Sequence, residues 1–139
     1  MSEALYAKGL LRLATSATGA GIFSPCDAKG EASNPVCGDR VTVTIALNAT
    51  GSIARLGHDT HACVLAQASA AILGAHLTGA TSADVSTLRA GVANMLRGEA
   101  IPPAPFTDYA ALLGAAQHRN RHTCVLLPLD AVINALGDK

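Results

Sequence analysis

The stretch Ser33–Leu47 has the sequence SNPVCGDRVTVTIAL, and its second half predicts a β-strand. Apolar residues alternate there with Thr and Ala, at Val41, Val43, Ile45 and Leu47. A period of two specifies a strand with one buried face. The tripeptide Cys37-Gly38-Asp39 comes directly before this strand, so a thiol and a carboxylate are placed at the point where the strand begins.

The sequence around this strand predicts a small antiparallel meander followed by helices. Asn48–Gly51 is a turn signal, and residues 52–58 can return as a second strand. A helix over 61–77 is predicted next, capped by Asp59 or Thr60 and largely buried, because it has almost no charge. A second helix starts at Ser82 and stops before Gly98.

The two ends of the chain are less regular in sequence. We expect a helix over 3–14 and a loop over 15–36, in which 21–23 is the only strand fragment. Residues 101–105 are proline-rich and must be extended. Thr107 is expected to cap a short helix over 108–117, and a last helix covers 123–136, where Pro128 predicts an irregular first turn around Cys124.

Length and composition exclude several classes of protein. The chain has 139 residues, with ten basic and ten acidic side chains, and no basic run typical of nucleic-acid binding. The densest basic run is Arg119-Asn120-Arg121. No secretion signal or membrane span is visible, so we expect one cytoplasmic domain over 1–139 with no nucleic-acid or membrane partner.

The chain has four cysteines, and in the absence of a secretion signal metal binding or thiol chemistry is favoured over disulfides. If the chain is extended from Cys37, then Cys37 and Asp39 project to one face; the alternative is a plain turn before a strand. Cys63 falls at a predicted helix start, where the thiolate is favoured, although a small buried hydrophobe is an equal alternative. Cys124 also falls at a helix start.

If these element ends converge, Cys37, Asp39, Cys63 and Cys124 form a set of thiolates and one carboxylate. Such a set suits tetrahedral Zn²⁺, or iron and sulfide. An oxygen ligand among thiolates makes one position easier to exchange. The spacing of the cysteines alone is not diagnostic. The remaining cysteine and histidines have no assigned role: Cys26, His58, His61, His76, His118 and His122.

Three segments together resemble the U-type iron–sulfur cluster assembly scaffolds, namely IscU, SufU and the amino-terminal domain of NifU. The segments are NPVCGD at 34–39, CVLAQASA at 63–70 and RHTCVLL at 121–127, in the order and approximate separation of that family. The resemblance runs from Asn34 to the C-terminus. It implies an α+β fold with a small antiparallel β-sheet of about three strands packed against several α-helices.

The resemblance also implies a function. Cys37, Asp39, Cys63 and Cys124 fall on the family's ligand positions for Zn²⁺, Fe²⁺ or a transient [2Fe-2S] cluster. A cysteine desulfurase hands persulfide sulfur to a scaffold cysteine, and the scaffold serves acceptor apo-proteins. IscU-like members have histidine where this chain has Thr123. The extra stretch 106–119 and Arg121 instead resemble the SufU branch, in which zinc is bound and the first motif cysteine, here Cys37, accepts sulfur.

Two other classes of function are open at the level of the sequence. One is a structural zinc-binding module that binds a partner without sulfur transfer. The other is a cysteine hydrolase that pairs Cys63 or Cys124 with the nearby His61 or His122. In the leading hypothesis the protein is a scaffold rather than a conventional enzyme. The one reaction it would take part in is zinc-dependent transfer of sulfur from a cysteine desulfurase.

Overall fold

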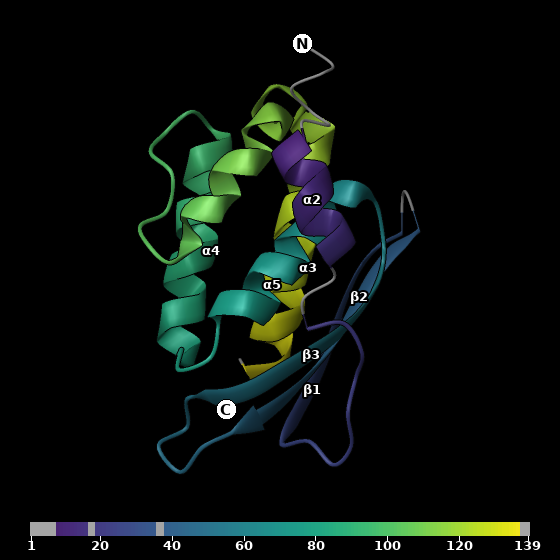
Figure 1. Cartoon of the computed structure of the whole chain (residues 1–139), viewed down its shortest axis with the longest axis vertical. Coiled ribbons are helices and arrows are strands. Elements are labelled where there is room, and N and C mark those ends of the chain that lie inside the picture. The colour runs from purple at the N-terminus through teal and green to yellow at the C-terminus, as the bar shows by residue number, and fades with distance from the viewer. Residues whose placement is uncertain (1–7, 17–18, 36–37, 137–139) are drawn as a thin grey trace.

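The computed structural model describes residues 8–16, 19–35 and 38–136. Within these ranges the chain forms an antiparallel sheet of strand order β1-β2-β3 and several helices, as the sequence predicted. In Figure 1, α3 and α5 lie between the sheet and α4. The elements are β1 (Ala28–Asn34), β2 (Asp39–Leu47), β3 (Ile53–His61), α2 (Lys8–Ser16), α3 (Val64–His76), α4 (Ser82–Leu96), the 3₁₀ helices η1 (Phe106–Gln117) and η2 (Arg119–Arg121), and α5 (His122–Leu136).

Strand β2 is the centre of the sheet and has the buried face that its sequence predicts. Val41, Val43 and Ile45 are at most 1% exposed beneath the helices. Thr44 projects to the opposite face, yet it is only 2% exposed. The chain before β1 covers it there, because the backbone N–H of Phe23 donates a hydrogen bond to Thr44 Oγ1 at 3.2 Å. Both faces of the central strand are therefore partly covered.

The prediction of a loop over 15–36 is wrong for residues 28–34, which form β1. The strand fragment predicted at 21–23 is not observed either; next to it, Ala20 makes only an isolated bridge to His58. The sequence of β1, AKGEASN, has no β-branched residue and so gives no strand signal. Backbone pairing with β2, from Ala28↔Ile45 to Asn34↔Asp39, holds the strand instead.

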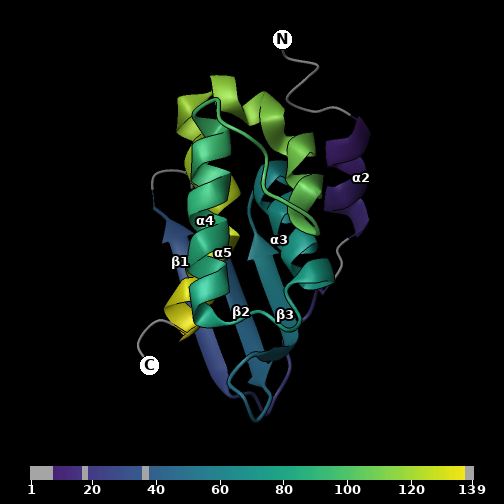
Figure 2. The same ribbon diagram turned by 90° about the vertical axis from the view of Figure 1, so that its left-hand side faces the viewer.

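Glycine allows β1 to pack closely beneath helix α5. A Cβ built on Gly30 would lie 2.4 Å from the carbonyl oxygen of Ala131 and 2.4 Å from the backbone nitrogen of Ala135. Only a residue without a side chain fits between the strand and the helix backbone at this distance. Figure 2 shows the sheet behind the helices from the side of α4.

The helix predicted over 61–77 begins later than expected. Pairing with β2 carries β3 to His61, so Asp59 and Thr60 lie in the strand and cap no helix. Helix α3 starts at Val64 with Cys63 as its N-cap. The side chain of Cys63 makes no capping hydrogen bond, which leaves its sulfur available for other contacts.

The second predicted helix is confirmed as α4, which starts at Ser82 and ends before Gly98. Its N-cap, Thr81, accepts a hydrogen bond from the backbone N–H of Asp84, whose carboxylate accepts one from the N–H of Thr81. This reciprocal capping box satisfies backbone donors that the helix leaves unpaired. The helix predicted over 3–14 is observed from Lys8 to Ser16, and residues 3–7 lie outside the described part.

The segment predicted as an α-helix over 108–117 with Thr107 as its cap is instead the 3₁₀ helix η1, with Pro105 at its N-cap. Tyr109, Leu112 and Ala115 are all fully buried, and their spacing of three residues matches the repeat of a 3₁₀ helix. Tyr109 Oη also lies 2.7 Å from the buried hydroxyl of Ser69 on α3. This apolar stripe and the buried Tyr109–Ser69 hydrogen bond hold η1 against the helical layer.

Helix α5 is regular from its first turn, so the irregular start predicted from Pro128 is wrong. Proline removes the backbone donor that would pair with the carbonyl of Cys124 four residues earlier. Packing on the sheet, α3 and α4 offsets the loss of that one hydrogen bond. None of the helices in the described ranges has the length and apolar character needed to cross a membrane.

Candidate metal centre

The first component of the candidate site is Asp39, which opens β2 after the hairpin turn from β1. Gly38 has φ +76° and its N–H donates a 2.8 Å hydrogen bond to the carbonyl of Asn34. The backbone is therefore not extended at Gly38, the residue directly before Asp39. Glycine suits this position because an L side chain disfavours positive φ.

Three of the four residues predicted as ligands lie together. One ligand atom each from Asp39, Cys63 and Cys124 forms a group in which every pair is within 4.8 Å. Sγ of Cys124 is 3.6 Å from Oδ2 of Asp39. The fourth predicted ligand, Cys37, lies outside the described residues.

Tertiary packing brings these three side chains together from separate elements. Asp39 begins β2, Cys63 joins β3 to α3, and Cys124 lies in the first turn of α5. Helix α5 packs across β1 and β2, and α3 packs on β3 and on α5. The N-terminal ends of α3 and α5 therefore lie at the end of the sheet where β2 begins.

The surroundings of Cys124 keep it protonated in the absence of metal. Its side chain is 3% exposed, and burial raises the pKa of the thiol to about 12, with further contributions from the nearby Cys63 and Asp39. Burial comes first among these causes, because a buried thiolate loses the water that would solvate its charge. A cation bound among the three would remove this penalty, because it stabilises the thiolate.

The chemistry of the described donor set fits a soft or borderline metal. Two sulfurs and a carboxylate are typical of sites for zinc or iron. With metal–ligand bonds of about 2.0–2.3 Å, tetrahedral geometry separates ligand atoms by about 3.5–3.8 Å. The 3.6 Å between Cys124 Sγ and Asp39 Oδ2 matches this separation. Because all three ligand atoms lie within 4.8 Å of one another, small side-chain movements are enough to bring them to tetrahedral distances.

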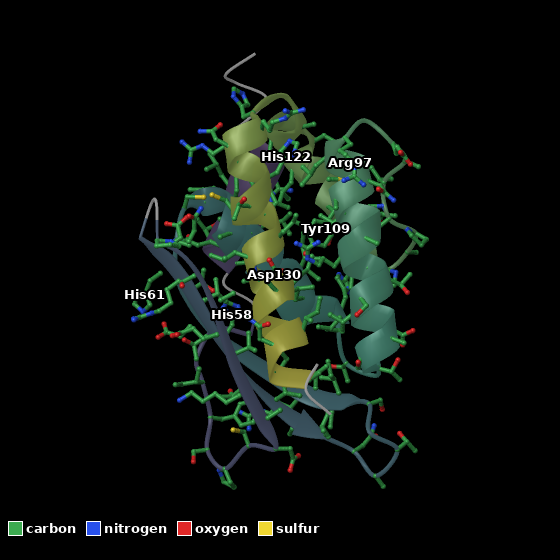
Figure 3. The ribbon with its side chains drawn as sticks, turned by 180° about the vertical axis from the view of Figure 1, so that it is seen from behind. His58, His61, Arg97, Tyr109, His122 and Asp130 are labelled. Atoms are coloured by element: carbon green, nitrogen blue, oxygen red, sulfur yellow. The ribbon has the colours of Figure 1, made fainter. Side chains whose placement is uncertain are left out.

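The histidines considered from the sequence have other contacts. His58 is buried on β3 with Nδ1 3.0 Å from Thr60 Oγ1, and His61 is exposed and pairs with Asp59 at 3.1 Å. His122 Nε2 lies 3.0 Å from the carbonyl oxygen of Ala116. Figure 3 shows His61 pointing away from the molecule on the outer side of the sheet.

No histidine belongs to the metal-binding group found among the described residues. The contacts of His61 and His122 with an aspartate and a carbonyl also give no support to a cysteine–histidine hydrolase. Cys26 is exposed and forms no disulfide with the other described cysteines. His76 lies near Asp108 at 3.5 Å and packs edge-on against Phe106, which is a structural role.

The sequence alone does not single out a second feature of the structure, a groove beside the start of α5. Arg119 appears in the sequence only as part of a short basic run, and Arg97 gives no signal at all. In the structure both line one groove together with His122. Arg97 and Arg119 are far apart in the chain, so their shared groove becomes visible only in the packed structure.

An α+β domain in which cysteine thiols and a carboxylate meet at one end of a three-stranded sheet defines a class of small metal- or cluster-binding domains. The chain belongs to the NifU-like N terminal domain family, whose model matches residues 5–124. This match includes Asp39, Cys63 and Cys124. It confirms the resemblance noted from the three sequence segments and extends it into the N-terminal part.

Solved structures share this fold over almost the whole chain. The amino-terminal part of a nitrogen-fixing NifU-like protein from Brucella abortus matches with TM-score 0.91 and 26% identity, covering 98% of this chain and 94% of that one. A protein from Fervidobacterium islandicum AW-1, described as an iron–sulfur cluster assembly scaffold for the SUF system, matches with TM-score 0.86 and 20% identity, covering 98% and 99%. Comparison with curated proteins gives no significant match.

Proposed function

We propose that this protein is an iron–sulfur cluster assembly scaffold that accepts persulfide sulfur from a cysteine desulfurase. The observation that carries the proposal is the group formed by Asp39, Cys63 and Cys124 in a chain of the NifU-like family. The shared fold of the Fervidobacterium protein, a scaffold for the SUF system, supports it. The chain acts as a single scaffold domain over 1–139.

Cys37 is the proposed sulfur acceptor. Its thiolate attacks the outer sulfur of the desulfurase persulfide, and a new sulfur–sulfur bond forms on Cys37. The sulfur–sulfur bond of the donor breaks, and the desulfurase cysteine leaves as a thiolate, so no external oxidant or reductant is needed. The sequence position of Cys37, two residues before Asp39 and within the first of the three family motifs, supports this role.

Asp39, Cys63, Cys124 and Cys37 are the proposed ligands of a metal ion or of a nascent [2Fe-2S] cluster. Bound Zn²⁺ would stabilise the thiolate forms of the cysteines. Asp39 is the proposed exchangeable ligand, since carboxylate oxygen is a harder donor than sulfur for a metal of this type. Cys124 and Cys63 hold the site to α5 and α3, and Asp39 holds it to the sheet.

The proposed partners are a cysteine desulfurase, which supplies sulfur, and acceptor apo-proteins, which receive sulfur or cluster. We place this exchange in the cytoplasm, where thiols stay reduced. Zinc is the proposed resident ion of the SufU-like branch, with Fe²⁺ or a transient cluster as the alternative. Elemental analysis and an absorption spectrum after anaerobic purification separate the two: one zinc without colour supports sulfur relay, and a labile brown chromophore supports cluster assembly.

A sulfur-transfer assay tests the acceptor assignment directly. A desulfurase charged with labelled sulfur is incubated with wild-type protein, with Cys37→Ser and with Cys26→Ser, whose thiol is exposed and outside the site. We expect label on the wild type and on Cys26→Ser, and loss of at least about tenfold on Cys37→Ser, because serine is not a thiolate nucleophile. Equal labelling of Cys37→Ser would remove Cys37 from this role.

A further inference from the structure

A groove of about 940 Å³ lies beside α5, on a different surface of that helix from Cys124. The end of α4 forms one wall, and the end of η1, η2 and the start of α5 form the other. Figure 3 shows Arg97 and His122 at the same end of the molecule. The lining residues are Ala93, Leu96, Arg97, Gly98, Ala116, Arg119, His122 and Leu126.

The rim of this groove is cationic. Arg97 and Arg119 are exposed, and no acidic side chain is among the lining residues. The guanidinium of Arg97 donates to the neutral amide oxygen of Asn94, and in the described part of the chain neither arginine forms an ion pair. The chain as a whole has no formal net charge, so two arginines without acidic partners are a local feature.

The floor of the groove is apolar. Leu96 is buried, Leu126 is partly buried against the core, and Ala93 and Ala116 leave room above them. An inorganic anion would use the rim and leave this floor unfilled. Nucleic acid would use the arginines alone, and recognition of its backbone requires more cations than this groove offers.

We propose that this groove binds an acidic peptide segment of a partner protein that also carries an apolar side chain. Carboxylates of the segment pair with Arg97 and Arg119, whose planar guanidinium groups suit carboxylates. A leucine-sized side chain fills the floor between Leu96 and Leu126. Charge complementarity at the rim and apolar burial at the floor together favour this chemistry over an inorganic anion or a nucleic acid.

The groove places such a segment close to the candidate centre without sharing its residues. His122 lines the groove, and Cys124 lies two residues later in the same helical turn. A partner bound through the groove would therefore stay beside the start of α5. The proposal is independent of the proposed function, because none of the three described candidate ligands, Asp39, Cys63 and Cys124, lines the groove.

The test uses the full chain and a short labelled peptide in which Glu and Leu residues are interspersed. Two matched peptides replace every Glu with Gln or every Leu with Ala, and a short oligonucleotide serves as an alternative anion. Binding is measured by fluorescence anisotropy and located by NMR shifts of backbone amides. We expect the Glu–Leu peptide to bind and to shift Gly98 and Ala116, and both matched peptides to bind more weakly.

Two charge-matched variants decide the assignment. Arg97→Gln combined with Arg119→Gln should weaken peptide binding about fivefold, as expected for the loss of two partly exposed ion pairs. Arg12→Gln combined with Lys29→Gln changes the net charge equally but lies on α2 and β1, and it should leave binding unchanged. Equal weakening by both pairs, shifts outside the groove, no peptide binding, or preference for the oligonucleotide would each overturn the proposal.

Discussion

Sγ of Cys124 lies 3.6 Å from the carboxylate of Asp39, although the two residues are 85 positions apart in the chain. The contact joins the first turn of α5 to the first residue of β2. Because the thiol is buried and protonated without metal, it donates to the carboxylate. A metal ion bound between them would replace that proton and convert a hydrogen bond into two metal–ligand bonds.

Replacement of Asp39 should weaken metal retention. Asp39→Ala removes the described oxygen donor, so we expect bound zinc or iron to dissociate at least about tenfold faster, the scale of effect seen when groups supporting a metal site are lost. Asp59→Asn is the matched control, since Asp59 is exposed on β3 and pairs with His61. Metal release is followed with a coloured chelator in excess. Identical release rates for Asp39→Ala and wild type would exclude Asp39 as a ligand.

Metal affinity should rise with pH. The pKa of the Cys124 thiol is raised to about 12, so below that pH metal binding must release its proton. This proton alone makes the apparent affinity rise about tenfold per pH unit between pH 6 and 9. Competition against a chelator of known pH dependence measures the slope. Cys124→Ala should lower the slope by one proton, and an unchanged slope would contradict the assignment of Cys124.

Gly30 and Gly91 should respond in opposite directions to the same substitution. Gly30→Ala places a methyl group 2.4 Å from the backbone of α5, and overpacking of this kind destabilises by about 1–3 kcal/mol. Gly91→Ala adds a methyl group in α4 with nothing within 4 Å, so we expect a gain of about 0.5–1 kcal/mol in the free energy of unfolding.

Urea denaturation of both glycine variants measures these changes. Because Gly30 sets the distance between β1 and α5, Gly30→Ala should also loosen the site that α5 completes with β2. Faster metal release from Gly30→Ala than from Gly91→Ala is the expected sign of that coupling. Equal stabilities of the two variants would mean that the sheet and α5 adjust freely to the added methyl group.

Metal removal should lower stability without unfolding the protein. A continuous apolar core links the sheet, α3, α4 and α5, and most of it lies away from the three candidate ligands. At a free metal concentration a hundredfold above Kd, the bound ion adds about 3 kcal/mol to the free energy of unfolding. Far-UV circular dichroism before and after chelation tests this. Loss of the helical signal would instead favour a purely structural zinc module.

The sequence determined the elements whose own side chains impose a pattern. The alternation at Val41, Val43 and Ile45 predicted β2, and the signals at Ser82 and Gly98 predicted both ends of α4. These predictions succeed because the period of buried residues and the chemistry of helix ends are local properties. The choice of Cys37, Asp39, Cys63 and Cys124 also came from the sequence, through helix starts and family motifs.

Only the tertiary structure decided features that depend on a neighbouring element. Strand β1 exists because β2 supplies its hydrogen bonds and Gly30 admits α5, whereas its own residues give no strand signal. The 3₁₀ form of η1 follows the stripe that Tyr109 and Leu112 bury. Asp39, Cys63 and Cys124 come within 4.8 Å because two helices pack on one sheet. The spacing of these residues along the chain allows them to form one site, and the packing of the apolar core places them there.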